Sequence, residues 1–222
     1  MASSLTTVVQ NARKLHTATG LGDSGYGWAP ETKKMGDTLE HVKFVLPNAP
    51  VQPVTINFAM EMPSWYDIYT LGDTEDILKN RVDEEGVLSS VVSVNRLIRN
   101  EIDAGIPSNR IVVGGFSQGA AVGITVGISS EYSLGGIIGL SGYLPLKEKT
   151  LTMATDANKN TPIFIGHGDM DQTVPYRLGK LSHDLLKSKG YPITFKTYNM
   201  QHESSPEETK DVIKFLQQVI PA

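Results

Sequence analysis

Short apolar runs alternate with longer segments whose apolar residues recur every three or four positions, from about residue 42 to the C-terminus. The short runs predict buried strands at residues 41–46, 110–113, 136–140, 162–166 and 193–198. The periodic segments predict helices at residues 87–102, 120–128 and 178–185. This alternation predicts an α/β fold with a mostly parallel central sheet and helices on both faces.

The last helix has the clearest start signal in the chain. Ser205 is a favourable N-cap, Pro206 suits the first helical position, and Glu208 completes a capping box. His202 therefore lies on the loop just before this helix.

The size and charge of the chain limit its class. At 222 residues it has the length of one substantial α/β domain, and we expect a single domain over residues 1–222. A net charge of -4 argues against nucleic-acid or anionic-membrane partners held by bulk electrostatics. The lack of cysteine excludes disulfides, a thiolate nucleophile and Cys-ligated metals. There is no secretion signal, and no apolar run approaches the roughly 20 residues of a membrane helix, so we expect a cytoplasmic protein without stable membrane insertion.

The segment Gly115–Gly119 reads G-F-S-Q-G and lies between a predicted strand and a predicted helix. It matches G-x-S-x-G, in which a sharp turn holds a serine hydroxyl above the sheet. Side chains at the glycine positions would collide with neighbouring backbone. We therefore predict that Ser117 is a nucleophile and that the Gln118 amide is an oxyanion donor, with a chance glycine-rich turn as the alternative.

A serine nucleophile needs a base, and the chain has five histidines. His16 precedes any predicted element, His41 opens a strand, and His183 is expected on the polar side of a helix. His167 directly follows a strand and is expected to shape a turn. His202 lies between a strand and a capped helix, so we predict it to be the general base, the alternative being a solvated loop histidine.

The residue that orients the base should lie between the serine and the histidine in the chain, on a loop after a strand. Asp169 and Asp171 both follow the predicted strand at residues 162–166, at the end where such sheets place functional groups. The spacing does not separate the two, and either could instead cap the turn.

Further motifs occur in a fixed order around this serine. They are Gly20-Leu-Gly-Asp-Ser-Gly25, Pro47-Asn-Ala-Pro50, Met62-Pro-Ser-Trp-Tyr-Asp67, Gly105-Ile-Pro-Ser-Asn-Arg110, Gly114-Gly-Phe-Ser-Gln-Gly119, Leu140-Ser-Gly142, His167-Gly-Asp-Met-Asp171 and His202-Glu-Ser204. With them, the chain from Gly20 to the C-terminus resembles the acyl-protein thioesterase and lysophospholipase family of small cytosolic carboxylesterases. The resemblance implies the α/β-hydrolase fold.

The resemblance also implies roles for particular residues. In similar proteins the second aspartate of H-G-D-x-D completes the triad, which points to Asp171 and makes Asp169 a structural carboxylate. The family's second oxyanion donor is the amide after the first glycine of the G-L-G-D loop, which maps to Leu21.

The implied activity is hydrolysis of long-chain thioesters on S-acylated proteins, including palmitoylated ones, with activity on lysophospholipids and small esters. The resemblance implies no metal or organic cofactor, and the negative net charge argues against a nucleic-acid partner. We expect a monomer or weak homodimer in the cytoplasm, with the nucleus as a second compartment. A general carboxylesterase or lysophospholipase on small lipid esters is the alternative.

An acyl chain needs an apolar groove, because ligand pockets are mostly apolar. We expect its wall at residues 71–81 and 60–65, with Trp65 and Leu71 in contact with substrate. Ordinary lid packing is the other interpretation of these residues.

The segment before Gly20 departs from the family pattern. Relatives have a β-branched and aromatic strand ending in His-Gly, whereas this chain reads Lys14-Leu-His-Thr-Ala-Thr-Gly20, as though about five strand residues were lost. The missing piece should be a buried central strand. Either residues 15–19 fill the gap, or the chain is a catalytically impaired acyl-binding variant.

The segment Gly20–Gly25 also matches the dinucleotide fingerprint G-x-G-x-x-G. That fingerprint needs a strong strand before it and a helix that begins inside it. We expect neither, because the preceding residues are polar and Tyr26–Pro30 should interrupt any helix.

Overall fold

A seven-stranded sheet forms the centre of the computed structural model, which describes residues 5–6, 13–71 and 82–222. In sheet order the strands are β1 (Leu5–Thr6), β3 (Val42–Leu46), β2 (Arg13–Ala18), β6 (Ile111–Phe116), β7 (Gly136–Leu140), β8 (Ile163–Gly168) and β9 (Ile193–Tyr198). β1 pairs antiparallel with β3, and the other pairs described in this sheet are parallel. The expected mostly parallel sheet is confirmed.

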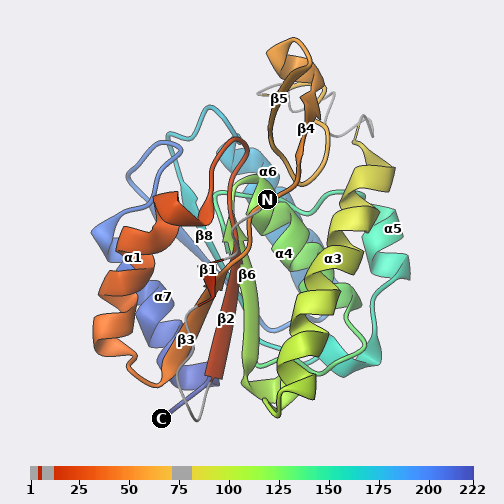
Figure 1. The fold of residues 1–222 in the computed structure, drawn as a ribbon. Helices are drawn as coiled ribbons and strands as arrows, with labels where there is room; N and C mark the ends of the chain where they lie inside the picture. Colours follow the sequence, from red (N-terminus) through yellow and green to blue (C-terminus); the bar gives the residue numbers. More distant parts are fainter. Residues whose placement is uncertain (1–4, 7–12, 72–81) are drawn as a thin grey trace.

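Helices cover both faces of the sheet (Figure 1). α1 (Gly25–Thr38) and α7 (Pro206–Val219) contribute to the apolar core on one face. α3 (Glu84–Asp103), α4 (Gln118–Ser129) and α6 (Tyr176–Ser188) contribute to the core on the other. The short α5 (Lys147–Thr152) packs against α4. Single 3₁₀ turns lie at η1 (Thr55–Asn57), η2 (Ser108–Arg110) and η3 (Asp156–Asn158).

Residues of the central strands alternate between these two cores. In β6, Ile111 and Val113 pack with α3 and α4, whereas Val112 packs with α1 and α7. In β8, Ile165 belongs to the core of α3 and α4, and Phe164 belongs to the core of α1 and α7. Because side chains of a strand point alternately to opposite faces, a sheet covered on both sides needs apolar residues at every position. This explains why these strands are continuous apolar runs in the sequence.

The central strand that the sequence pattern does not predict is present as β2. Arg13–Ala18 pairs in parallel with β3 on one side and β6 on the other, with His16 opposite Val45 and Val113. The expectation of a lost strand is wrong, and the alternative in which the residues before Gly20 fill the gap is confirmed. Pairing on both sides satisfies backbone groups whatever the side chains are, so a polar sequence can occupy this place. The prediction that His16 precedes any element is also wrong.

A helix begins directly after the Gly20–Gly25 loop. α1 contains Pro30, so the prediction that Tyr26–Pro30 interrupts any helix is wrong. Pro30 is the sixth residue of α1, and its ring removes one helical hydrogen bond near the N-terminus without ending the helix. The hydroxyl of Thr32 donates to the carbonyls of Trp28 and Ala29, at 3.1 Å each.

β4 (Val51–Val54) and β5 (Met60–Pro63) form a separate antiparallel pair. It projects from the body of the molecule at the top of Figure 1. The chain continues from this hairpin to Leu71, beside the site described next.

Candidate active site

Ser117 lies at the junction between β6 and α4, with φ 56° and ψ -119°. A non-glycine residue with positive φ is strained, and such strain persists where the surrounding structure enforces it. Gly115 allows the turn, because a Cβ at this position would lie 2.3 Å from the carbonyl carbon of Gly119. The G-x-S-x-G pattern therefore reflects a steric requirement of this fold.

Ser117, His202 and Asp171 form one hydrogen-bonded line. The Oγ of Ser117 lies 2.9 Å from Nε2 of His202, and Nδ1 of His202 lies 2.7 Å from Oδ2 of Asp171. Oδ1 of Asp171 accepts hydrogen bonds from the amides of Thr173 and Val174, at 2.9 Å each. The Asp171 side chain is fully buried. Its own turn thus fixes the carboxylate, which can hold the imidazole in the tautomer that accepts the serine proton.

Asp169, the other candidate, lies on the same loop but takes no part in this line. It is exposed, and its amide donates to the carbonyl of Tyr198 at 3.0 Å. The structure brings Asp171 to His202, a distinction that the spacing in the sequence could not make.

His167 supports the turn that carries Asp171. Its ring is fully buried, and Nε2 donates to the carbonyl of Val174 at 2.9 Å. Nε2 also lies 3.5 Å from Oδ2 of Asp171. Burial lowers the pKa of His167, so a neutral ring holds the two ends of the turn together.

The prediction that His183 lies on the polar side of its helix is wrong. His183 is buried, and its ring packs on Phe195 with the ring centroids 5.3 Å apart. The buried face of α6 is rotated relative to the leucine stripe, because Leu178 is buried whereas Leu181 and Leu185 are half-buried.

The amides of Leu21 and Gln118 are available near Ser117. In the described structure Leu21 donates no hydrogen bond, whereas the neighbouring Gly22 amide donates to Pro63 at 2.8 Å. The Gln118 amide is the first of α4, where helices leave amides without an intrahelical acceptor. A Cβ on Gly20 would lie 3.6 Å from Cβ of Ser117, so the Leu21 loop passes beside the serine.

Trp65, expected to contact substrate, is buried and is not among the residues that line the cavity beside Ser117. Its indole nitrogen donates to the carbonyl of Thr19 at 3.0 Å and so holds the start of the Leu21 loop. The Gln118 side chain accepts from the Trp65 amide at 2.9 Å and donates to the carbonyl of Tyr66 at 2.7 Å. This structural role of Gln118 has no signal in the sequence, because its partners lie more than fifty positions away.

A cavity of about 390 Å³ opens beside Ser117 and His202. Its apolar wall is formed by Trp28, Ile68, Leu71 and Phe116. Leu71 therefore lines the cavity, and its contact with substrate stays a prediction. Residues 72–81 of the expected wall lie outside the described residues, and in the described lining no residue comes from Met60–Trp65.

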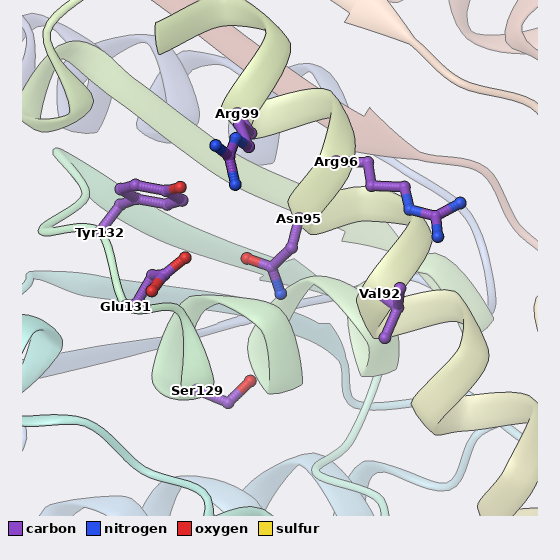
Figure 2. A pocket seen from close by; sticks show the side chains of 7 residues that line it. All are labelled: Val92, Asn95, Arg96, Arg99, Ser129, Glu131 and Tyr132. Atoms are coloured by element: carbon purple, nitrogen blue, oxygen red, sulfur yellow. The ribbon is translucent and has the colours of Figure 1, made fainter. Parts of the chain in front are cut away.

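A second cavity, of about 320 Å³, lies between α3 and the far end of α4 (Figure 2). It is lined by Val92, Asn95, Arg96, Arg99, Ser129, Glu131 and Tyr132. Ser129 is twelve residues along α4 from Ser117, which corresponds to about 18 Å of helix. This cavity is thus remote from the triad.

The Gly20–Gly25 loop does have the strand and the helix that a dinucleotide fingerprint requires, contrary to our expectation. The amides at the start of the helix are nevertheless taken up within the chain. Asp23 accepts from the Ser24 amide and Asn48 accepts from the Gly25 amide, both at 2.7 Å. A carboxylate thus stands at the helix N-terminus where a pyrophosphate would bind, and the loop does not fit a dinucleotide.

Among the residues that the structure describes, no group of three or more His, Asp or Glu side chains is arranged to hold a metal ion. None of the helices in these residues is both long and apolar enough to cross a membrane.

The chain is similar to known esterases and thioesterases in both sequence and structure. A model of the phospholipase/carboxylesterase family matches residues 7–220. The acyl-protein thioesterase 1 of Neurospora crassa is 45% identical over 216 residues, covering 93% of this chain and 88% of the relative. The acyl-protein thioesterase 1 of Yarrowia lipolytica is 44% identical, covering 94% of this chain and 95% of the relative. The crystal structure of Arabidopsis thaliana SOBER1 has a TM-score of 0.88 at 29% identity, covering 94% of this chain and 99% of that one. The crystal structure of Zea mays acyl-protein thioesterase 2 has a TM-score of 0.81 at 25% identity, covering 99% of this chain and 100% of that one.

Proposed function

The chain belongs to the phospholipase/carboxylesterase family and is a serine hydrolase with the α/β-hydrolase fold; we propose that it cleaves long-chain acyl thioesters on S-acylated proteins. The observation that carries this proposal is the hydrogen-bonded line from Ser117 through His202 to Asp171, at the mouth of an apolar cavity. Relatives at 44–45% identity named acyl-protein thioesterase 1 support the thioester as the bond that is cleaved.

The first half of the reaction forms an acyl-enzyme. His202 Nε2 removes the proton of Ser117 as Oγ attacks the thioester carbonyl, and Asp171 stabilises the imidazolium that results. The amides of Leu21 and Gln118 donate to the oxyanion of the tetrahedral intermediate. The C–S bond then breaks, and the departing sulfur takes the proton from Nε2.

The second half releases the acid. Water gives a proton to Nε2 of His202 and attacks the acyl carbonyl, and the same two amides again hold the oxyanion. The C–O bond to Ser117 breaks, Oγ recovers its proton from His202, and the free enzyme is restored.

The walls of the cavity support a long apolar acyl group. Trp28 and Phe116 pack with ring centroids 5.2 Å apart, and Phe116 packs on His202 at 4.8 Å. Together with Ile68 and Leu71 they give the acyl chain an apolar surface next to the base. As part of the same proposal, the protein works as a monomer or weak homodimer in the cytoplasm, with the nucleus as a second compartment.

The test is competitive turnover of an S-palmitoylated peptide against lysophosphatidylcholine by the wild type and by Ser117→Ala. We expect the thioester to be hydrolysed preferentially by the wild type and neither substrate by the folded variant. Hydrolysis at the wild-type rate by Ser117→Ala would remove the assignment of the nucleophile. Preference for the lysolipid would favour the lysophospholipase alternative, and folded wild type that cleaves neither would favour an acyl-binding protein.

A further inference from the structure

We propose that Glu203 forms a subsite for the leaving half of the substrate, which selects S-acyl cysteines with a lysine or arginine close by in the peptide. This inference rests on the proposed thioesterase function and specifies which acyl-protein sequences the same site prefers. It follows from a second space on the other side of the catalytic imidazole.

A polar cavity of about 450 Å³ adjoins the apolar one. It is lined by Gln172, Thr173, Gln201, His202 and Glu203. Thr173, His202 and Glu203 also line the apolar cavity, so the two spaces meet along the imidazole. Ser117, by contrast, lines the apolar cavity and is not part of the polar lining.

The reaction assigns a different part of the substrate to each space. The acyl chain needs the apolar cavity, and the oxyanion faces the amides of Leu21 and Gln118. The departing sulfur takes its proton from His202 Nε2, so the cysteine must lie against this imidazole. The polar cavity borders the imidazole, and it therefore receives the residues that flank the cysteine.

Charge favours a cation in that position. In the described lining of the two cavities the carboxylates are Asp23 and Glu203, and there is no lysine or arginine. Asp23 is held by the Ser24 amide, whereas Glu203 is exposed and accepts a long hydrogen bond, 3.4 Å, from the Gln201 amide. An ammonium or guanidinium group at Glu203 would gain a charged partner, and an acidic side chain would be repelled.

The position of Glu203 also sets the reach of this preference. It follows His202 directly, and consecutive Cα atoms lie about 3.8 Å apart. The acylated cysteine lies against His202, so the residues that come near Glu203 are its close neighbours in the peptide. A cation that reaches Glu203 therefore belongs to a residue immediately next to the cysteine or one position further.

The experiment uses three S-octanoyl peptides that are identical except for lysine, glutamine or glutamate on both sides of the cysteine. We expect kcat/KM of the wild type to fall from the lysine to the glutamine to the glutamate peptide. A partly exposed ion pair predicts a step of about two- to fivefold between the lysine and glutamine peptides at low salt. The step should shrink at high ionic strength, because salt screens exposed charges. Glu203→Gln should abolish the step, and Glu203→Lys should reverse the order of the peptides.

Glu131→Gln is the matched control, because it removes the same charge at the remote cavity (Figure 2). It should keep the wild-type ratio of lysine to glutamine peptide. An equal fall of that ratio in Glu131→Gln and Glu203→Gln would assign the preference to the charge of the whole molecule and contradict the subsite. Ser117-dependent hydrolysis of all three peptides with equal kcat/KM would contradict the subsite alone. Absence of Ser117-dependent hydrolysis of every peptide would instead overturn the proposed function, and the subsite with it.

Discussion

Glu208 is a buried carboxyl group in the first turn of α7, six residues after His202 in the chain. Its side chain is 1% exposed, and among the described residues neither oxygen has a hydrogen-bond partner, so the prediction that Glu208 completes a capping box is wrong. A Cβ on Gly166 would lie 2.3 Å from Oε1, so the carboxyl lies directly over the backbone of β8. Burial raises the pKa of Glu208 to about 8, and the group is therefore mostly protonated in the folded protein at neutral pH.

This burial predicts a pH-dependent stability. The pKa of Glu208 in the folded protein lies above the reference value of 4.5. The contribution of the protonated carboxyl to stability is therefore fully present below about pH 4.5 and is lost as the pH rises towards about 8. The slope across this window is about 1.4 kcal/mol per pH unit at most. Glu208→Gln removes this dependence, and its unfolding free energy relative to wild type should rise between about pH 5 and pH 8. Denaturant unfolding at both values measures this.

The control for Glu208→Gln is Glu207→Gln, which removes a carboxylate from the exposed side of the same turn. Its stability relative to wild type should change little over the same pH window. A flat difference between Glu208→Gln and wild type would show that the buried carboxyl does not titrate between the two pH values.

At the residue scale, the sequence could identify the groups whose local backbone is constrained. Ser117 is marked by a nearby glycine, Gly115, that the turn requires, and His202 by its place before a capped helix. Asp169 and Asp171 are two positions apart on one loop, and only the three-dimensional contact with His202 separates them. The side-chain hydrogen bonds of Gln118 join distant segments and leave no local pattern.

At the scale of elements, the loop of Asp171 depends on the contact between β8 and α6. The ring of His167 fills the space above Gly179, where an added Cβ would lie 2.3 Å from Nδ1. Interiors are close-packed, so this ring cannot move without displacing its neighbours. A shift of β8, of α6 or of the turn that ends with Val174 therefore displaces the other two.

Gly179→Ala tests this packing. The added methyl group should push on His167, cost about 1–3 kcal/mol of stability and lower kcat by shifting Asp171. Gly36→Ala is the control, because a Cβ there has nothing closer than an ordinary contact of 3.8 Å in α1. That variant should be stabilised by about 0.5–1 kcal/mol with unchanged kcat, since alanine favours a helix. Thermal unfolding and esterase kinetics measure both, and wild-type stability and kcat in Gly179→Ala would contradict the account.

Elements with strong patterns were predictable, and those formed by tertiary pairing were not. β7 and β9 have the predicted bounds, and α7 begins after the predicted N-cap, where Ser205 accepts from the Glu208 amide at 3.1 Å. β2 lacks an apolar run and is defined by its two neighbouring strands. The sequence pattern does not predict α1, because Pro30 argues against a helix there. In the structure the proline is tolerated, since in an early turn of a helix few hydrogen bonds are lost.

At the scale of the whole molecule, the sheet brings distant segments to one edge. Ser117 follows β6, Asp171 follows β8 and His202 follows β9, and the carboxyl ends of parallel strands share an edge. β2 belongs to this arrangement, because it lies between β3 and β6 and leads into the loop of Leu21. The oxyanion loop thus depends on a strand whose sequence is largely polar.

The pairing of β2 predicts slow hydrogen exchange. Residues 13–16 pair with β3 and residues 14–18 with β6, so their amides should exchange on the time scale of β6 rather than that of unstructured chain. The hairpin strand β5, which has one neighbour, should exchange faster. Hydrogen–deuterium exchange followed by mass spectrometry of peptides resolves these segments. Complete exchange of residues 13–18 within seconds would contradict a central position for β2.

The most direct test of the proposed chemistry is the mass of the enzyme during turnover of a long-chain thioester. Acid quenching within the first turnovers should trap a covalent adduct with the mass of the acyl group, and peptide mapping should locate it on Ser117. The adduct should be absent from Ser117→Ala, because the ester bond needs the serine oxygen. Rapid thioester hydrolysis without an adduct in Ser117→Ala, or an adduct that maps to another residue of the wild type, would contradict the account.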